Sequence, residues 1–247
     1  MKKFYKIYPS LLEKIIKARF TVYIYYIEVI FTSMKNHETS RAITKNEYER
    51  LIRHLADKFW NTTSPNRKFV YLRDACLYSM MWNIGLRPKE SYGAKLSDIR
   101  LEDRLFFVDS SRNKTRKPRI RKIPKSIVKL LEKYLCIRKS LFQRNKYLFP
   151  SISGKCISRR TLQINFERVL RNLGLLEIEY VDKRGIPRYT INLYSFRKGH
   201  ATYLYEETGD PYIVKESLDH KNIETTIKFY IKTMPGKTQD RICSVFN

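Results

Sequence analysis

The sequence predicts a mainly α-helical fold with a small antiparallel β-sheet, an α+β architecture. Helical apolar periodicity and glycine stop signals mark most of the chain, and only one segment has the pattern of a β-hairpin. A length of 247 residues and a hydrophobic content of 43% allow a sizeable core. That core could lie in one large domain or in a main domain with a small partner.

The chain is expected to divide near residue 40. Residues 1–38 are basic and helical in pattern, and the polar run Lys35-Asn-His-Glu-Thr-Ser40 is typical of a linker. We therefore predict a short helical amino-terminal segment, a main domain and a carboxy-terminal tail, which cover residues 1–39, 40–235 and 236–247.

The main domain begins with a helix that the capping-box pattern Thr44-Lys-Asn-Glu47 opens. Its apolar residues recur at intervals of three and four, at Tyr48, Leu51, Ile52, Leu55 and Phe59. A second helix, over about 69–84, is expected to end at Gly85, because glycine suits the left-handed position after a helix. Arg87 then lies just beyond a helix end.

Two short strands are expected next, at Leu105–Ser110 and Arg119–Pro124, and the basic turn between them contains Lys114. The rest of the domain has helical patterns, with Gly174 and Gly209 as stop signals. These later helices are expected at about 125–138, 159–173, 195–207 and 211–218.

The charge balance indicates a polyanionic partner. Fifty lysines and arginines against 24 acidic residues give a formal net charge of +26, spread along the whole length. Nucleic acid is favoured over a membrane surface, because the most apolar run, 19–34, is too short to span a bilayer and contains Glu28. No signal-peptide pattern precedes the first helix.

The four cysteines are scattered, with no CxxC pair and no metal-ligand grouping with the four histidines. This usage predicts a protein of the reducing cytosol without a structural zinc or another metal site.

Five motifs carry candidate chemistry. Attack on a phosphodiester needs a nucleophile, cations for the charge on the nonbridging oxygens and an acid for the departing sugar oxygen. Arginine binds phosphate through two hydrogen bonds and stays charged, whereas lysine can give up a proton. The motifs are, in order, Gly85-Leu-Arg87-Pro-Lys-Glu90, Lys114-Thr-Arg-Lys-Pro-Arg119, Tyr194-Ser-Phe-Arg197, Leu218-Asp-His220 and Thr225-Thr-Ile-Lys-Phe-Tyr230.

In this order and spacing the motifs resemble the catalytic domain of tyrosine recombinases, the phage-integrase and Xer-like family, over about residues 40–235. The resemblance implies the fold of that domain and a role for each residue. Arg87 and Arg197 would bind the scissile phosphate, and Glu90 would orient an arginine or a lysine. Lys114 would protonate the leaving 5′ oxygen, with Lys117 as the alternative.

The last two motifs supply the remaining groups of the resemblance. His220 fits the histidine of the family's Leu-Gly-His box, and Tyr230 fits the nucleophile ten residues later. The alternative spacing of nine residues falls on Phe229, which cannot attack.

Two residues depart from the family pattern. Tyr194 stands where the family usually has histidine, and a phenol with an ordinary pKa near 10 is a poor base at neutral pH. Tyr194 is counted among the catalytic residues with a hydrogen bond to the phosphate as its expected role, and whether it replaces the histidine functionally stays open. Asp219 replaces the glycine of the Leu-Gly-His box, and of its two possible roles, orienting His220 or capping a helix, we favour the cap.

Structural roles compete with these functional ones. An arginine after a helix can simply cap carbonyls, a lone histidine near a helix end is ordinarily structural, and His200 is expected in the core. The basic turn is expected to be a solvated face that contacts DNA phosphates. Its members are Arg112, Arg116, Lys117 and Arg119.

The resemblance implies a site-specific recombinase that forms a 3′-phosphotyrosine at Tyr230 and needs no cofactor, because the covalent link conserves the energy of the phosphodiester. It also implies double-stranded DNA as partner, a homotetramer on two duplexes, a cytoplasmic, nucleoid-associated location, and integration or excision of a mobile element. The tail after Tyr230 would dock on a neighbouring subunit or on its own domain.

Two other function classes stay open. The first is a degenerate family member that binds DNA without cutting it, since Tyr194, Asp219 and an amino-terminal segment shorter than the family's core-binding domain all depart from the pattern. The second is a topoisomerase-like enzyme that nicks and closes DNA without sequence preference.

Overall fold

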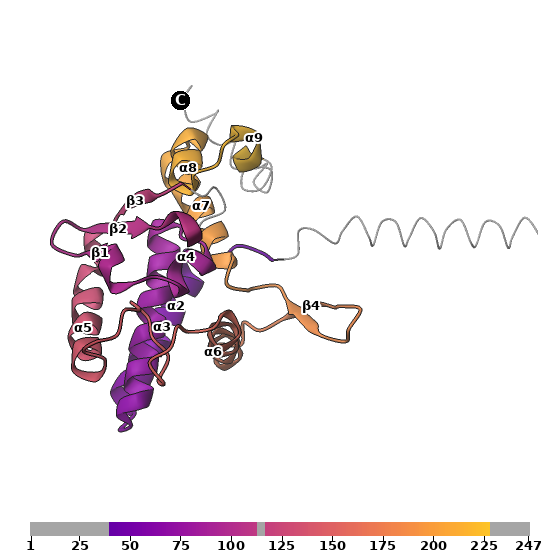
Figure 1. The fold of residues 1–247 in the computed structure, drawn as a ribbon. Helices are drawn as coiled ribbons and strands as arrows, with labels where there is room; N and C mark the ends of the chain where they lie inside the picture. Colours follow the sequence, from indigo (N-terminus) through magenta and orange to yellow (C-terminus); the bar gives the residue numbers. More distant parts are fainter. Residues whose placement is uncertain (1–39, 113–116, 228–247) are drawn as a thin grey trace, which may run out of the picture. The chain divides into compact units, whose positions relative to one another are not determined.

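The computed structural model describes residues 40–112 and 117–227, and within them it is mostly helical with a small antiparallel sheet (Figure 1). The predicted fold class is therefore confirmed. The expectations for residues 1–39 and for the tail 236–247 lie outside the described residues.

Helix α3 (Pro65–Ile84) is the central element, and most of its residues are buried. It packs against α2 (Lys45–Asn61), α5 (Lys125–Leu141) and α7 (Ser195–Thr208), as Figure 1 shows for α2 and α5. A helix covered on several sides is apolar nearly all round. It begins at Pro65, earlier than the expected 69, because proline is favoured at the first helical position.

The signals predicted for the start of α2 and the end of α3 are present in the structure. Oγ1 of Thr44 accepts from the Glu47 amide at 3.2 Å, and a Glu47 carboxylate oxygen accepts from the Thr44 amide at 2.9 Å. This capping box fixes the start of α2. Gly85 ends α3 with a φ of 65°, in the left-handed region.

The predicted hairpin forms two strands of a three-stranded antiparallel sheet of order β1-β2-β3. Strand β2 (Leu105–Val108) pairs with β3 (Arg119–Lys122), with Phe106 opposite Arg121 and Val108 opposite Arg119. Strand β1 (Ile99–Arg100) was not predicted, because two residues are too few to show alternation.

The later helices also lie where the sequence placed them. Helices α5, α6 (Arg159–Asn172) and α7 differ from the expected ranges only at their carboxyl ends, and α8 (Pro211–Leu218) has the expected range. Sequence patterns missed the elements of one turn or little more, which are α4 (Pro88–Tyr92), η1 (Leu96–Asp98), η2 (Ser110–Arg112) and α9 (Ile223–Thr226).

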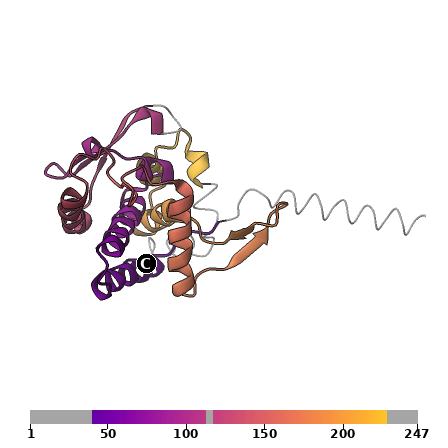
Figure 2. The same cartoon turned by 60° about the horizontal axis from the view of Figure 1, so that its bottom comes forward.

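A second hairpin was also missed. Strands β4 (Ile178–Val181) and β5 (Pro187–Tyr189) pair after α6 and project away from the helices in both views (Figures 1 and 2). Ile178 and Val181 are exposed, and no face of this hairpin is buried, so the alternation that marks a half-buried strand is absent.

Close packing around α7 positions the candidate site. The rings of Tyr78, Phe166 and Phe196 contact one another and join α3, α6 and α7. At Gly199, a Cβ would come within 2.3 Å of both the Ile43 carbonyl oxygen and the Trp82 ring. Only glycine allows this approach, which sets the distance between α7 and α3.

Candidate active site

Arg87 is held at the start of α4, three residues after Ile84, the last residue of α3. Its backbone amide donates to Oε2 of Glu90 at 2.8 Å, and its Nη1 donates to Oε1 of the same carboxylate at 2.9 Å. Glu90 is fully buried, whereas the Arg87 side chain keeps 20% of its surface exposed. The structure thus places Glu90 against the arginine and leaves part of Arg87 open to solvent.

Arg197 lies in the first turn of α7 and joins two helix ends. Its Nη1 donates to the carbonyl of Gly85, which follows α3, and its Nη2 donates to the carbonyl of Leu218, the last residue of α8. Carbonyls at a helix carboxyl end have no partner within the helix and carry partial negative charge. Two such ends therefore stabilise one largely buried guanidinium.

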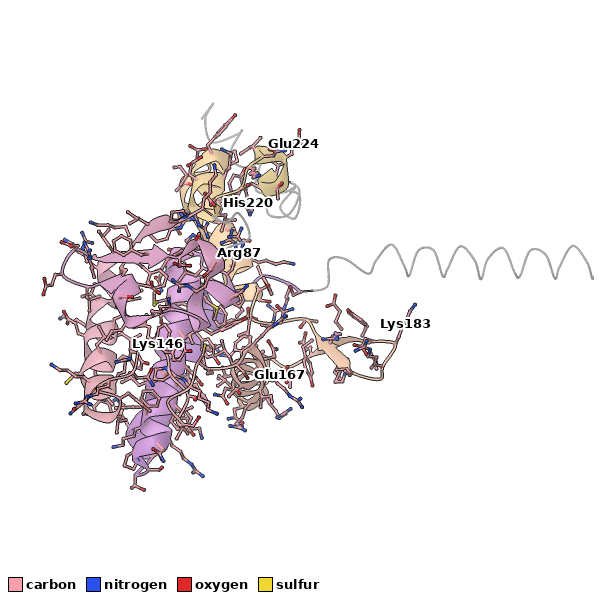
Figure 3. All side chains as sticks on the ribbon, viewed as in Figure 1. Arg87, Lys146, Glu167, Lys183, His220 and Glu224 are labelled. Atoms are coloured by element: carbon pink, nitrogen blue, oxygen red, sulfur yellow. The ribbon has the colours of Figure 1, made fainter. Side chains whose placement is uncertain are left out.

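His220 follows α8 and lies within electrostatic range of the same two arginines. Its Nδ1 is 2.9 Å from Oγ1 of Thr226 in α9. Burial lowers the pKa of His220 to about 4, and the positive charges of Arg197 and Arg87 act in the same direction, while Asp219 opposes them. The imidazole is therefore neutral at pH 7. Figure 3 shows Arg87 and His220 at the same end of the domain.

Two predicted DNA-contacting residues lie inside the protein. Arg112 is 9% exposed, pairs with Asp98 at 2.7 Å and donates to the Glu90 carbonyl at 3.4 Å. The Arg119 side chain is 8% exposed and pairs with the carboxylates of Glu90 and Asp219. The expectation of a solvated face was therefore wrong for both arginines, because each forms ion pairs with carboxylates that the fold brings close to it. Lys117 is exposed, as expected.

Tyr194 occupies the amino-terminal cap of α7 and is 44% exposed. Its backbone amide donates to Oδ1 of Asn192 at 2.9 Å. The guanidinium of Arg159, at the start of α6, lies over its ring at 5.9 Å. Tyr194 is thus at the surface beside a cation, three residues before Arg197 in the chain.

Several predicted site residues lie outside the described residues. They are Lys114, Arg116 and Tyr230, and their assignments stay predictions. In the part of the chain that the structure describes, no group of three or more histidine, cysteine, aspartate or glutamate side chains is arranged to hold a metal ion. Nor does any helix there have the length and apolarity to cross a bilayer.

Sequence reasoning missed the contacts of three residues that it had named. Asp219 has a φ of 55° at the end of α8, and besides capping the helix it pairs with Arg119. Thr226, noted only as part of a motif, is the partner of His220. His200 joins α3 to α8, with Nδ1 2.7 Å from the Trp82 carbonyl and Nε2 2.7 Å from Oγ of Ser217. No local pattern could reveal these pairs, because the partners are brought together by the fold.

Taken together, the described residues include groups of the kind that bind an oxyanion. Arg87 and Arg197 supply two permanent positive charges, and His220 supplies a neutral ring that can exchange a proton. Such a group suits a phosphoryl centre whose oxygens gain negative charge during reaction.

Comparisons with known proteins agree with this geometry. The model of the phage integrase family matches residues 27–235. Tyrosine recombinase XerC of Thermodesulfovibrio yellowstonii is 28% identical over 202 residues, which are 74% of this chain and 62% of the relative. XerC of Psychromonas ingrahamii is 31% identical over 156 residues, 63% of this chain and 47% of the relative.

Solved structures show the same fold. XerH recombinase bound to a palindromic difH substrate aligns with a TM-score of 0.64 at 20% identity, over 85% of this chain and 54% of that one. The Tn1549 transposon integrase in complex with circular intermediate DNA aligns with a TM-score of 0.58 at 15% identity, over 79% of this chain and 62% of that one. The chain spans about half to three fifths of the length of the relatives that it matches.

Proposed function

Because this chain belongs to the phage integrase family of tyrosine recombinases, we propose that it is a site-specific DNA recombinase that cleaves and rejoins DNA through a 3′-phosphotyrosyl intermediate. The observation that carries the proposal is the convergence of Arg87, Arg197 and His220 from three separate elements. Chance placement of basic residues on a protein of charge +26 would not bring two arginines and a neutral histidine to adjoining helix ends.

The reaction assigns one step to each group. The Tyr230 oxygen attacks the scissile phosphorus, the bond from phosphorus to the 5′ oxygen breaks, and Lys114 gives that oxygen a proton. Arg87 and Arg197 stabilise the charge on the nonbridging oxygens. As the new bond forms, the neutral His220 accepts the phenolic proton of Tyr230. The products are a 3′-phosphotyrosine and a 5′-hydroxyl.

Rejoining reverses these steps with a 5′-hydroxyl from a partner strand. The phosphotyrosine retains the energy of the original phosphodiester, so we propose that no cofactor is needed. Exchange between two duplexes requires an assembly of subunits, for which we propose a homotetramer on DNA. The relatives include an integrase from a transposon and recombinases named XerC, which supports integration, excision or resolution of a DNA element as the task. The proposed location of the protein is then the cytoplasm, in association with the nucleoid.

Recovery of covalent protein–DNA complexes tests the proposal for any target sequence. The protein is incubated with a library of duplexes that carry a randomised segment and a nick, denatured, and separated with any DNA attached. The wild-type protein should yield an enriched sequence, and Tyr230→Phe should yield none. Tyr212→Phe, which alters an exposed tyrosine on α8, is the matched control and should behave as wild type.

Other outcomes identify the alternatives. DNA binding without any adduct would contradict the proposal and favour a degenerate family member. Adducts without sequence enrichment, together with relaxation of supercoiled plasmid by dilute protein, would favour the topoisomerase-like enzyme. An adduct that persists in Tyr230→Phe would place the nucleophile elsewhere.

A further inference from the structure

One guanidinium connects the residues on either side of the candidate site. Nη2 of Arg119 pairs with the Glu90 carboxylate, which also holds Arg87, and Nη1 donates to Oδ2 of Asp219 at 3.0 Å. The side chains of Arg119 and Glu90 are 8% and 1% exposed. A continuous chain of ion pairs therefore runs from α4 through β3 to the end of α8.

The chain of ion pairs connects two parts of the site with proposed catalytic roles. One of its ends is Arg87 itself. At the other end, Asp219 lies between Leu218, whose carbonyl accepts from Arg197, and His220. Any shift of the α8 end against β3 would therefore move an acceptor of Arg197 and the backbone of His220 together.

The backbone alone does not call for an aspartate at position 219. Its φ of 55° lies in the left-handed region, where glycine is the least strained residue and aspartate or asparagine is tolerated. Aspartate adds what glycine and asparagine lack, a charge for Arg119. Because Arg119 is shielded from water, a neighbouring negative charge stabilises its guanidinium more than it would stabilise an exposed arginine.

We propose that Arg119 is a positioning residue that acts through two carboxylates, holding Arg87 by way of Glu90 and the His220 loop by way of Asp219, so that both stand ready before DNA binds. This inference rests on the proposed function, because it assigns a role within that site. It also gives Asp219 a second task beyond capping α8.

A double-mutant cycle tests the coupling. The rate constant for cleavage is measured in single turnover on a nicked duplex recovered from the library, for Asp219→Asn, Arg119→Ala and the double variant, with DNA affinity and melting temperature measured alongside. Asparagine keeps the left-handed backbone accessible and removes only the charge. Asp219→Asn should slow cleavage on the order of tenfold with little change in affinity.

The double variant decides between coupling and independence. If Arg119 acts through Asp219, the double variant should cleave no more slowly than Arg119→Ala. The proposal would be overturned if the rate constant of the double variant fell by the product of the two single-variant factors. It would also be overturned if Asp219→Asn cleaved as fast as wild type. Asp182→Asn, which breaks the Arg188 ion pair on the distant β4–β5 hairpin, is the control for general loss of an ion pair and should cleave as wild type.

A second measurement needs no cleavage. The titration of His220 is followed by NMR in the free protein, where Arg197 and Arg87 lower its pKa and the Asp219 carboxylate raises it. Asp219→Asn should lower the His220 pKa, whereas Arg119→Ala should raise it, because Asp219 then loses its cation. Unchanged titration in both variants would overturn the proposal even in an active enzyme. Opposite shifts in a protein that never cleaves would support the ion-pair chain and reject only the recombinase function.

Discussion

His200 makes the stability of the domain depend on pH. The Trp82 carbonyl can only accept, so Nδ1 of His200 carries the proton and Nε2 accepts from the Ser217 hydroxyl. A second proton on His200 would reverse that hydrogen bond, so that Nε2 donates to Oγ of Ser217. Burial lowers the pKa of His200 from 6.5 to about 4, and the charges of Arg197 and Arg121 act in the same direction.

The sign and size of the effect follow from linkage. Between pH 6.5 and pH 4 the unfolded chain binds a proton at His200 that the folded protein does not bind, so the free energy of unfolding falls as the pH falls. At about 1.36 kcal/mol for each unit of pKa, the full difference amounts to about 3 kcal/mol. Below about pH 4 the contribution of His200 no longer changes.

The measurement compares urea unfolding of the wild-type protein and His200→Gln at a series of pH values from 8 to 4. Glutamine does not titrate, so from pH 8 to pH 4 the free energy of unfolding of the wild type should fall by up to about 3 kcal/mol more than that of the variant. His220 and the carboxylates titrate in both proteins and cancel in the difference. Parallel curves for the two proteins would refute the reasoning, whatever their separation at pH 7.

Two further predictions concern packing and the leaving group. Gly199→Ala should lower the free energy of unfolding by about 1–3 kcal/mol or more, since its Cβ would meet the Ile43 carbonyl and the Trp82 ring at 2.3 Å; an unchanged melting temperature would contradict this. Lys114→Ala should regain cleavage on a substrate whose 5′ bridging oxygen is sulfur, which leaves without a proton, whereas Arg87→Ala should not. If Lys117→Ala is rescued instead, Lys117 is the acid.

The sequence was most informative where a local rule decides the structure. The capping box at Thr44 and the glycine at position 85 mark helix ends that depend on neighbouring residues only. The β4–β5 hairpin was missed because it buries no face, and α4 and α9 because a single turn has no period. Elements that are short or not packed against a core leave little pattern in the chain.

The sequence pointed to the residues of the candidate site but not to the pairs that they form. Motif spacing selected Arg87, Arg197 and His220, and the structure brings them together. The same reasoning assigned Arg119 to DNA, because a basic turn ordinarily faces solvent. Arg119 instead pairs with Glu90 and with Asp219, which is 100 residues away in the sequence, and only the folded chain shows these contacts.

The motifs that mark the site are also the signals that end and begin helices. Gly85 ends α3, Arg87 begins α4, Tyr194 begins α7 and Asp219 ends α8. Unpaired backbone groups gather at helix ends, so a guanidinium such as that of Arg197 finds carbonyl acceptors there. A substitution at Gly85 would thus act on the site twice. It would strain a φ of 65° and press a Cβ to 2.7 Å from the His200 ring, and either change would displace the carbonyl that Arg197 needs.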